Sequence, residues 1–110
     1  MTNSLSADAV VIGAGIIGTA VAYELAKRGQ RTISVDRAPK AGYGSTSSSC
    51  AIIRVHYSTL EGTAFAFDAY HDWEDWSGYL GAASAKDLDD ARFHKTGCLV
   101  MKTEGNGHLT

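Results

Sequence analysis

Three glycines near the start of the chain, Gly13, Gly15 and Gly18, have the spacing G-x-G-x-x-G. The apolar run at residues 9–12 predicts a strand just before them, because strands of a buried parallel sheet are apolar on both faces. Over residues 15–28 apolar side chains recur every four positions, which predicts a helix. A glycine turn that joins a buried strand to a helix is typical of dinucleotide-binding folds.

Each glycine of this turn has its own steric role. Gly13 permits the tight turn out of the strand, Gly15 lets a pyrophosphate approach the backbone, and Gly18 lets the helix pack close to the sheet. The first N–H groups of the helix are unpaired and carry partial positive charge, which attracts phosphate. The residues of this turn and helix start predicted to form the cofactor-binding site are Gly13, Gly15, Ile16, Ile17 and Gly18.

A second strand is predicted over residues 32–36, and it ends in Asp36, 18 positions after Gly18. An acid at about this distance typically accepts hydrogen bonds from the adenosine ribose hydroxyls. Its charge also disfavours the additional phosphate of NADP. We expect Asp36, with Arg37 beside it, to complete the adenosine side of the site. An ordinary turn carboxylate is the alternative for Asp36.

Beyond this βαβ unit the pattern predicts further elements. Residues 45–49 all carry hydroxyl groups, which favours a helix N-terminus. Aromatic and apolar residues at steps of three and four predict a helix over residues 59–80, with the aromatic stripe as core packing. Residues 93–95 and 97–101 predict two short strands around a bend. The expected class is therefore α/β, with a Rossmann-like βαβ unit followed by a helix and further strands.

The composition excludes several function classes. The net charge is −2 and basic residues are scattered, so neither nucleic acid nor an anionic membrane surface is an expected partner. No apolar run approaches the roughly 20 residues that span a bilayer, and the start lacks the layout of a signal peptide. The histidines and cysteines lack metal-ligand spacing, so no metal site is predicted. We expect Cys50 and Cys98 to be free, buried or half-buried thiols in a reducing cytoplasm.

The segment at residues 42–57, which reads GYGSTSSSCAIIRVHY, resembles the D-amino acid oxidase superfamily of flavoproteins when taken with the βαβ unit. The resemblance is to sarcosine oxidase and dimethylglycine dehydrogenase-like enzymes in particular. It extends over most of the chain, including residues 96–99. It implies FAD as the cofactor and oxidation of a C–N bond in a small amine or amino acid as the reaction.

The same resemblance implies roles for residues of this segment. Its hydroxyl-rich turn lies under the ribityl and pyrophosphate groups in the family. The residues implied to make these contacts are Gly44, Ser45, Thr46 and Ser49. Ala51 and Ile52 are implied to lie near the isoalloxazine ring, and Arg54 is implied to hold a substrate carboxylate. A surface or interdomain ion pair is the alternative for Arg54.

Two positions depart from the family pattern. Ala51 stands where monomeric sarcosine oxidases carry a second arginine, so the resemblance does not imply sarcosine as the substrate. Ser48 stands where dimethylglycine dehydrogenases carry the histidine that bonds covalently to FAD. The resemblance therefore predicts non-covalent FAD.

The expected organisation is an FAD-binding and flavin-contacting part at residues 1–58 and the start of a substrate domain at residues 59–110. Two strands make a poor sheet, and a buried parallel sheet needs cover on both faces. We therefore expect the chain to be the N-terminal portion of a longer oxidoreductase, and inactive alone. The sheet side chains expected to be exposed in the isolated chain are those of Val10, Ile12, Ile33 and Val35.

Two alternatives to this interpretation stay open. The first is an NAD-binding Rossmann module, which would use the same glycines and Asp36 but has no need of the hydroxyl-rich turn. The second is a non-catalytic truncated product that binds nothing.

Overall fold

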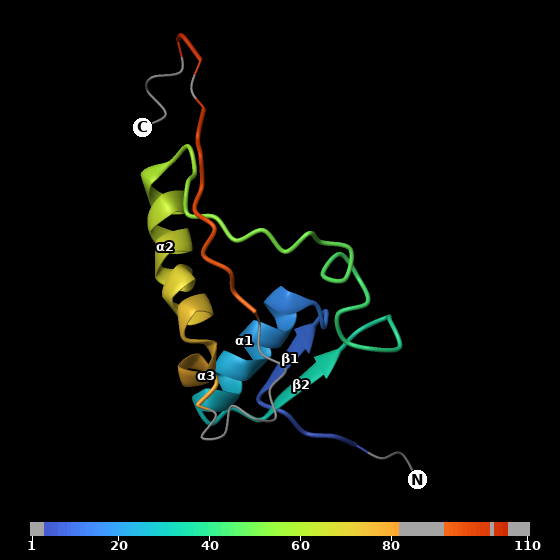
Figure 1. The fold of residues 1–110 in the computed structure, drawn as a ribbon. Coiled ribbons are helices and arrows are strands. Elements are labelled where there is room, and N and C mark those ends of the chain that lie inside the picture. The colour runs from blue at the N-terminus through green and yellow to red at the C-terminus, as the bar shows by residue number, and fades with distance from the viewer. Residues whose placement is uncertain (1–3, 82–91, 102, 106–110) are drawn as a thin grey trace. The chain divides into compact units, whose positions relative to one another are not determined.

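The computed structural model of the protein describes residues 4–81, 92–101 and 103–105. The chain divides into two compact units, Met1–Ala51 and Ile52–Thr110. The first unit contains β1, α1 and β2, and the second contains α2 and α3 (Figure 1).

The first unit is a parallel βαβ unit. Strand β1 (Ala9–Ile12) leads into helix α1 (Ile16–Lys27), which returns the chain to strand β2 (Thr32–Val35). The two strands pair in parallel, with Ala9 opposite Thr32 and Ile12 opposite Val35. In Figure 1 helix α1 lies along this pair of strands. The predicted strand–helix–strand order is confirmed, with boundaries that differ from the prediction by at most one residue.

The turn between β1 and α1 depends on two glycines for steric reasons. Gly13 has a φ of 109°, a left-handed value that side chains rarely adopt, and its N–H continues the strand pairing with a 2.8 Å bond to the Val35 carbonyl. Gly18 lies so close to the Gly13 carbonyl that a Cβ at position 18 would collide with it. The close approach of helix and strand predicted for Gly18 is therefore confirmed.

Helix α1 ends in a Schellman motif around Gly29, whose φ is 79°. The Gly29 N–H donates to the Ala26 carbonyl at 2.9 Å, and the Gln30 N–H donates to the Leu25 carbonyl at 3.0 Å. These two bonds satisfy carbonyl groups that the helix end would otherwise leave unpaired. The chain is thus turned back toward the start of β2 within a few residues.

The predicted helix over residues 59–80 is divided in two. Helix α2 (Leu60–Glu74) ends at Asp75, where φ is −119° and ψ is 59°, and the short helix α3 (Trp76–Tyr79) follows. The Asp75 carboxylate accepts the Gly78 N–H at 3.0 Å and so caps α3. Aspartate competes for backbone N–H groups in this way, which is why it favours helix starts over helix interiors.

The helix start predicted at residues 45–49 is wrong, because this stretch forms successive turns. The Ser48 N–H donates to the Ser45 carbonyl at 3.2 Å, and the Ser49 N–H donates to the Thr46 carbonyl at 3.3 Å. The helical course is not continued, since Ala51 adopts a φ of 53°.

The two strands predicted at residues 93–95 and 97–101 are also wrong. The described residues of this stretch form no strand. The Thr96 N–H donates locally to the His94 carbonyl at 2.9 Å, and Gly97 has a φ of 77°, so the backbone bends here. A strand also needs a neighbour with free backbone groups, and no described segment pairs with this one.

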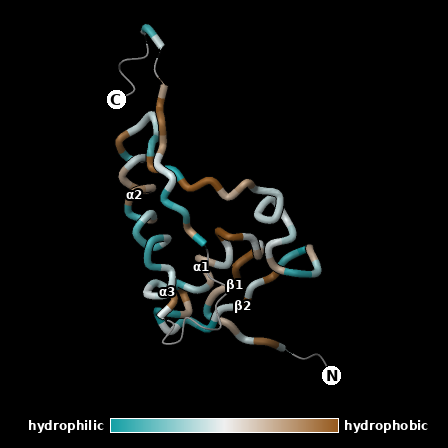
Figure 2. The backbone as a smooth tube through the Cα atoms, viewed as in Figure 1, coloured by the Kyte–Doolittle hydropathy of each residue, from teal (hydrophilic) through white to brown (hydrophobic). Residues whose placement is uncertain are grey.

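No described side chain is fully buried. Val10 is 60% exposed and Ile12 is 86% exposed, although both belong to the sheet. Strand β1 is apolar, brown in Figure 2, and its side chains Val10 and Ile12 lie at the surface of the first unit. The predicted exposure is confirmed for Val10, Ile12 and Val35, whereas Ile33 is half-buried. Among the described helices, none combines the length and apolar character needed to cross a membrane.

Candidate functional site

The peptide of Ala14, in the middle of the glycine turn, is held on both sides. Its N–H donates to Asp36 Oδ2 at 2.6 Å. Its carbonyl accepts the N–H of Gly42 at 2.8 Å. The turn after β1 is therefore fixed by contacts with two residues that follow β2.

Asp36 makes a second backbone contact at the end of β2. Its Oδ1 accepts the N–H of Ala38 at 2.7 Å. The Ala14 N–H, then the Ala38 N–H, and more weakly the positive charge of Arg37 hold the pKa of Asp36 below its usual value. A carboxylate has about four lone-pair sites, so this exposed side chain keeps capacity for further donors. It is an ionised hydrogen-bond acceptor next to the glycine turn.

Helix α1 begins at a residue that cannot cap it. Gly15 is the N-cap and has no side chain, so no capping bond comes from this position. The N–H of Ile16 donates instead to Thr46 Oγ1 at 3.0 Å, across 30 positions of sequence. A Cβ at Gly15 would come within 3.0 Å of the same Thr46 oxygen. Thr46 is thus brought to the helix start, and Gly15 makes room for it.

The other hydroxyl groups of residues 45–49 lie differently. Thr46 is half-buried, whereas Ser45 and Ser49 are exposed. Ser49 Oγ accepts the N–H of Ala51 at 3.1 Å. Ala51 is the one non-glycine residue with positive φ in the part of the chain that the structure describes. Such a conformation costs about 1 kcal/mol or more for a residue with a Cβ.

The predicted site residues thus fall into both units. The first unit brings together the glycine turn, Asp36 and Thr46, and it also contains Arg37, Gly44 and Ala51. Ile52 and Arg54 belong to the second unit. The anchoring roles of Ala14, Ala38 and Gly42 were missed, because they act through backbone groups that leave no mark in the sequence.

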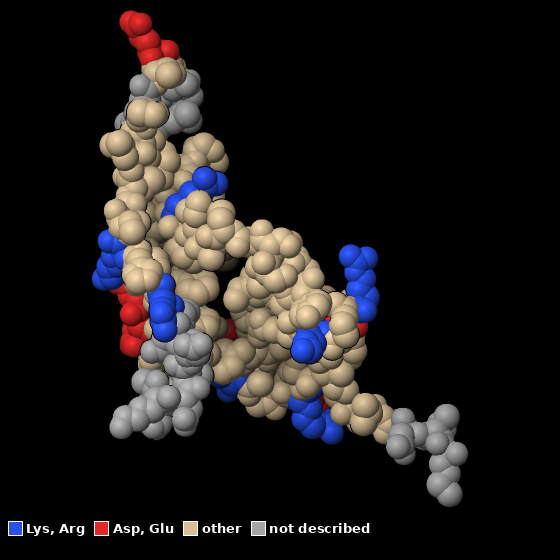
Figure 3. Space-filling view, turned by 45° about the vertical axis from the view of Figure 1, so that its right-hand side comes forward, with Lys and Arg blue, Asp and Glu red and all other residues tan. Residues whose placement is uncertain are grey.

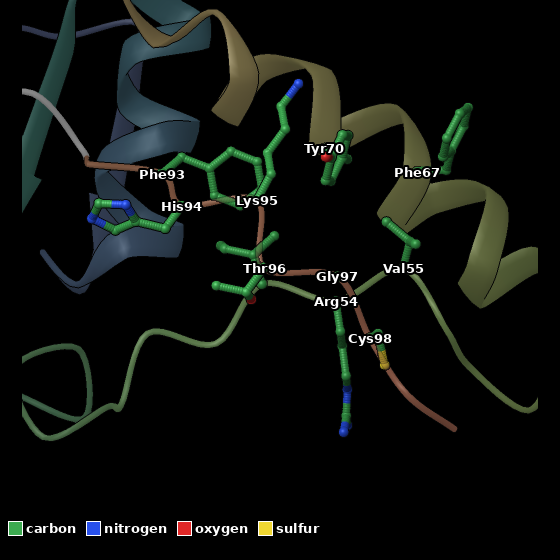
Figure 4. A pocket seen from close by; sticks show the side chains of 11 residues that line it. Arg54, Val55, Phe67, Tyr70, Phe93, His94, Lys95, Thr96, Gly97 and Cys98 are labelled. Carbon is green, nitrogen blue, oxygen red and sulfur yellow. The ribbon is translucent and has the colours of Figure 1, made fainter. Parts of the chain in front are cut away.

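In the second unit Arg54 lies against an aromatic ring. Its guanidinium is 5.3 Å from the centroid of the Tyr57 ring, within the range of a cation–π contact. Among the described side chains Arg54 forms no ion pair. In Figure 4 its side chain extends away from Phe93 and Tyr70. The guanidinium is exposed and available to a planar anion.

A pocket of about 320 Å³ lies in the same unit (Figure 4). It is lined by residues 53–55 and 93–98 together with Phe67 and Tyr70 of α2. The Tyr70 and Phe93 rings meet edge to face with centroids 5.2 Å apart. Glu74 binds both Lys95 and His71, which ties the segment at residues 93–98 to helix α2.

Among the described residues, the remaining polar side chains form no metal centre. On the face shown in Figure 3, the described Lys and Arg side chains of neither unit gather into one large basic patch. Within residues 4–81, 92–101 and 103–105, no group of three or more His, Cys, Asp or Glu side chains lies close enough to hold a metal ion. Cys50 and Cys98 are free thiols, but both are exposed, so their predicted burial is wrong. The reason is that neither lies in a region enclosed by packed elements.

Comparison with known proteins gives a family and several relatives. Residues 8–109 match the family model described as FAD dependent oxidoreductase. The chain is 34% identical over 94 residues to a glycine oxidase of Bacillus subtilis (strain 168). The aligned residues are 86% of this chain and 25% of that protein. It is 35% identical over 99 residues to a monomeric sarcosine oxidase of Bacillus sp. (strain B-0618), with coverages of 89% and 24%.

A probable sarcosine oxidase of Arabidopsis thaliana is 39% identical over 82 residues, which are 74% of this chain and 18% of that protein. The chain thus spans about a quarter or less of the length of these curated relatives. No solved structure gives a significant match.

Proposed function

Since the chain belongs to the FAD-dependent oxidoreductase family, we propose that its first unit binds the adenosine diphosphate half of FAD. The observation that carries the proposal is the 2.6 Å bond from the Ala14 N–H to the Asp36 carboxylate. This bond fixes the ionised Asp36 carboxylate beside a turn in which glycine residues leave backbone N–H groups accessible. Ribose hydroxyls and phosphates need this combination of an acceptor next to exposed N–H groups.

The residues of the first unit fit such a cofactor. Gly15 has no side chain, and a Cβ there would fill the space that Thr46 now approaches. Asp36 retains acceptor capacity for the ribose hydroxyls, and Arg37 follows it at the end of β2. The residues of this turn and helix start that we propose for the cofactor-binding site are Gly13, Gly15, Ile16, Ile17 and Gly18.

The hydroxyl-rich turn supports the choice of FAD over NAD. An NAD module needs the glycine turn and the acid but no second polar segment. Here Thr46 links residues 42–49 to the start of α1 through the Ile16 N–H. The residues that we propose for the phosphate, ribityl and ring portions of FAD are Gly44, Ser45, Thr46, Ser49, Ala51 and Ile52.

We further propose that the substrate is a small amine or amino acid oxidised at a C–N bond. The relatives named glycine oxidase and sarcosine oxidase support this class. Bound flavin supplies the two-electron oxidation. Arg54 would hold a substrate carboxylate through paired N–H donors, because its guanidinium is exposed and makes no ion pair with a described carboxylate. A reducing compartment such as the cytoplasm suits the exposed thiols of Cys50 and Cys98.

Replacing Asp36 by Ala tests the proposal in the protein produced from its natural gene. We expect flavin content to fall at least about tenfold, because a charged acceptor contributes about 1.5–3 kcal/mol. Asp8→Ala is the matched control: Asp8 also accepts a backbone N–H, that of Arg31 at 2.8 Å, but at the other end of the strands. Equal flavin content in both variants and the wild type would contradict the proposal.

The same preparations test how the cofactor is held. After acid precipitation, flavin should be found in the supernatant, because Ser48 offers no nucleophilic ring nitrogen for a covalent bond. Flavin fluorescence in the precipitate would contradict non-covalent binding. Release of a nicotinamide nucleotide without flavin would favour the NAD-binding alternative.

A further inference from the structure

The start of α1 has an unusual source of capping. A helix leaves its first N–H groups without partners inside the helix, and the N-cap side chain ordinarily accepts one of them. Gly15 provides no such group, and its neighbour Ile16 uses Thr46 Oγ1 at 3.0 Å. The cap therefore comes from a segment that follows β2 rather than from the helix itself.

Thr46 is singled out within its own turn. It is half-buried, whereas the serines on both sides of it are exposed. Its oxygen is also the atom nearest to a Cβ built at Gly15, at 3.0 Å. The contact between the two segments is close enough that a side chain at Gly15 would displace Thr46.

A second bond ties the same segments together. The Gly42 N–H donates to the Ala14 carbonyl at 2.8 Å. Residues 42–46 are therefore attached to the glycine turn at both of their ends. Thr46 supplies the side-chain half of this attachment, and a single substitution can remove it without altering the backbone bond.

The hydroxyl of Thr46 has one donor and two acceptor sites. One acceptor site is used by the Ile16 N–H, and no acceptor for the hydroxyl proton is found in the part of the chain that the structure describes. The Ile16 N–H is directed at Thr46, so an anion at this helix start would meet the Thr46 hydroxyl. A hydroxyl that accepts from a helix N–H becomes a better donor, because successive hydrogen bonds polarise one another.

From this geometry we infer that Thr46 is a positioning residue. It caps α1 across the chain and holds the hydroxyl-rich turn at the glycine turn before FAD binds. The contact of Thr46 with a phosphate oxygen belongs to the proposed function, and the effect of the cap on FAD affinity rests on it. The cap itself concerns the cofactor-free protein alone.

The test compares Thr46→Val, Thr46→Ser and Ser48→Ala in the protein produced from its natural gene. Valine keeps the shape but cannot accept or donate, serine keeps the hydroxyl, and Ser48→Ala removes a neighbouring hydroxyl that makes no side-chain bond to a described residue. In the cofactor-free protein we expect Thr46→Val to lower the protection of the Ile16 amide against hydrogen exchange about fivefold. This is the effect expected from loss of one N-cap hydrogen bond. FAD affinity, followed by flavin fluorescence, should fall about tenfold or more.

Thr46→Ser should restore both quantities, and Ser48→Ala should leave both at the wild-type level. The inference is overturned if Ile16 protection is unchanged in Thr46→Val, if serine fails to rescue, or if protection falls while FAD affinity stays constant. If Thr46→Val loses helical circular dichroism, Thr46→Ala takes its place, because alanine removes the hydroxyl without crowding Gly15. Failure of the wild type to bind FAD refutes the proposed function, and amide exchange then decides the capping role alone.

Discussion

At the scale of single residues, contacts within the chain hold the glycine turn in place without a ligand. Asp36 was expected from its position to accept ribose hydroxyls, and in the structure it already accepts the N–H groups of Ala14 and Ala38. The sequence predicts the acid at the end of β2, because the motif has a defined spacing. It does not predict the Ala14 anchor, since every residue type except proline supplies the same N–H at position 14.

The pH dependence of this anchor follows from the lowered pKa of Asp36. A carboxyl whose folded pKa lies below its unfolded value stabilises the fold fully above the unfolded value, and this contribution is lost as pH falls through the folded value. In the cofactor-free protein, the Ala14 and Ala38 amide resonances should therefore titrate with a midpoint below about 3.9, the usual aspartate pKa.

Amide chemical shifts recorded from pH 7 downward measure this transition. Asp36→Asn serves as the control and should show no titration of either amide. A midpoint at or above the usual aspartate value would mean that the two N–H groups do not bind the carboxylate in solution.

At the scale of elements, the predicted order of strand, helix and strand is confirmed. Apolar periodicity and glycine spacing predict these elements because both depend only on residues near one another in sequence. The strands predicted at residues 93–95 and 97–101 failed for a non-local reason, since a strand exists only with a partner. The helix predicted over residues 59–80 failed at Asp75, where a side-chain cap overrides apolar periodicity. Local patterns were therefore sufficient for the βαβ part of the first unit, but not for residues 45–49 of that unit or for the second unit.

The end of α1 provides a prediction at this scale. Gly29→Ala should lower the free energy of unfolding by about 1–2 kcal/mol, because alanine is strained at the observed φ of 79°. Chemical denaturation of the cofactor-free protein measures the change.

Gly44→Ala is the control for this variant, since a Cβ there meets no atom within 4 Å and φ is not left-handed. It should change stability by less than about 0.5 kcal/mol. Equal stability of the two variants would show that the Schellman turn at Gly29 is not formed in solution.

At the scale of the whole molecule, the described chain has no enclosed core. Val10, Ile12 and Val35 of the sheet are exposed, as are Phe65 and Phe67 of α2. Apolar surface of this kind favours association with other apolar surface. The stability of the described elements therefore depends on turns, caps and strand pairing more than on buried side chains.

A polypeptide of these 110 residues, produced by itself, should accordingly bind a hydrophobic dye, elute as aggregates at micromolar concentration and retain almost no flavin. Size-exclusion chromatography with absorbance at flavin wavelengths measures both properties. A monomeric yellow product would contradict this expectation, because it would require the exposed sheet to be stable in water.

The steric role of Gly18 bears on how such motifs change over evolutionary time. A Cβ at this position would strike the Gly13 carbonyl of the same chain, so selection for folding alone retains the glycine. A descendant without the proposed function would still preserve the spacing as long as it kept the βαβ unit. Mutational decay of the proposed function would leave its first trace elsewhere, at an exposed side chain such as Arg54, whose described contact is with the Tyr57 ring.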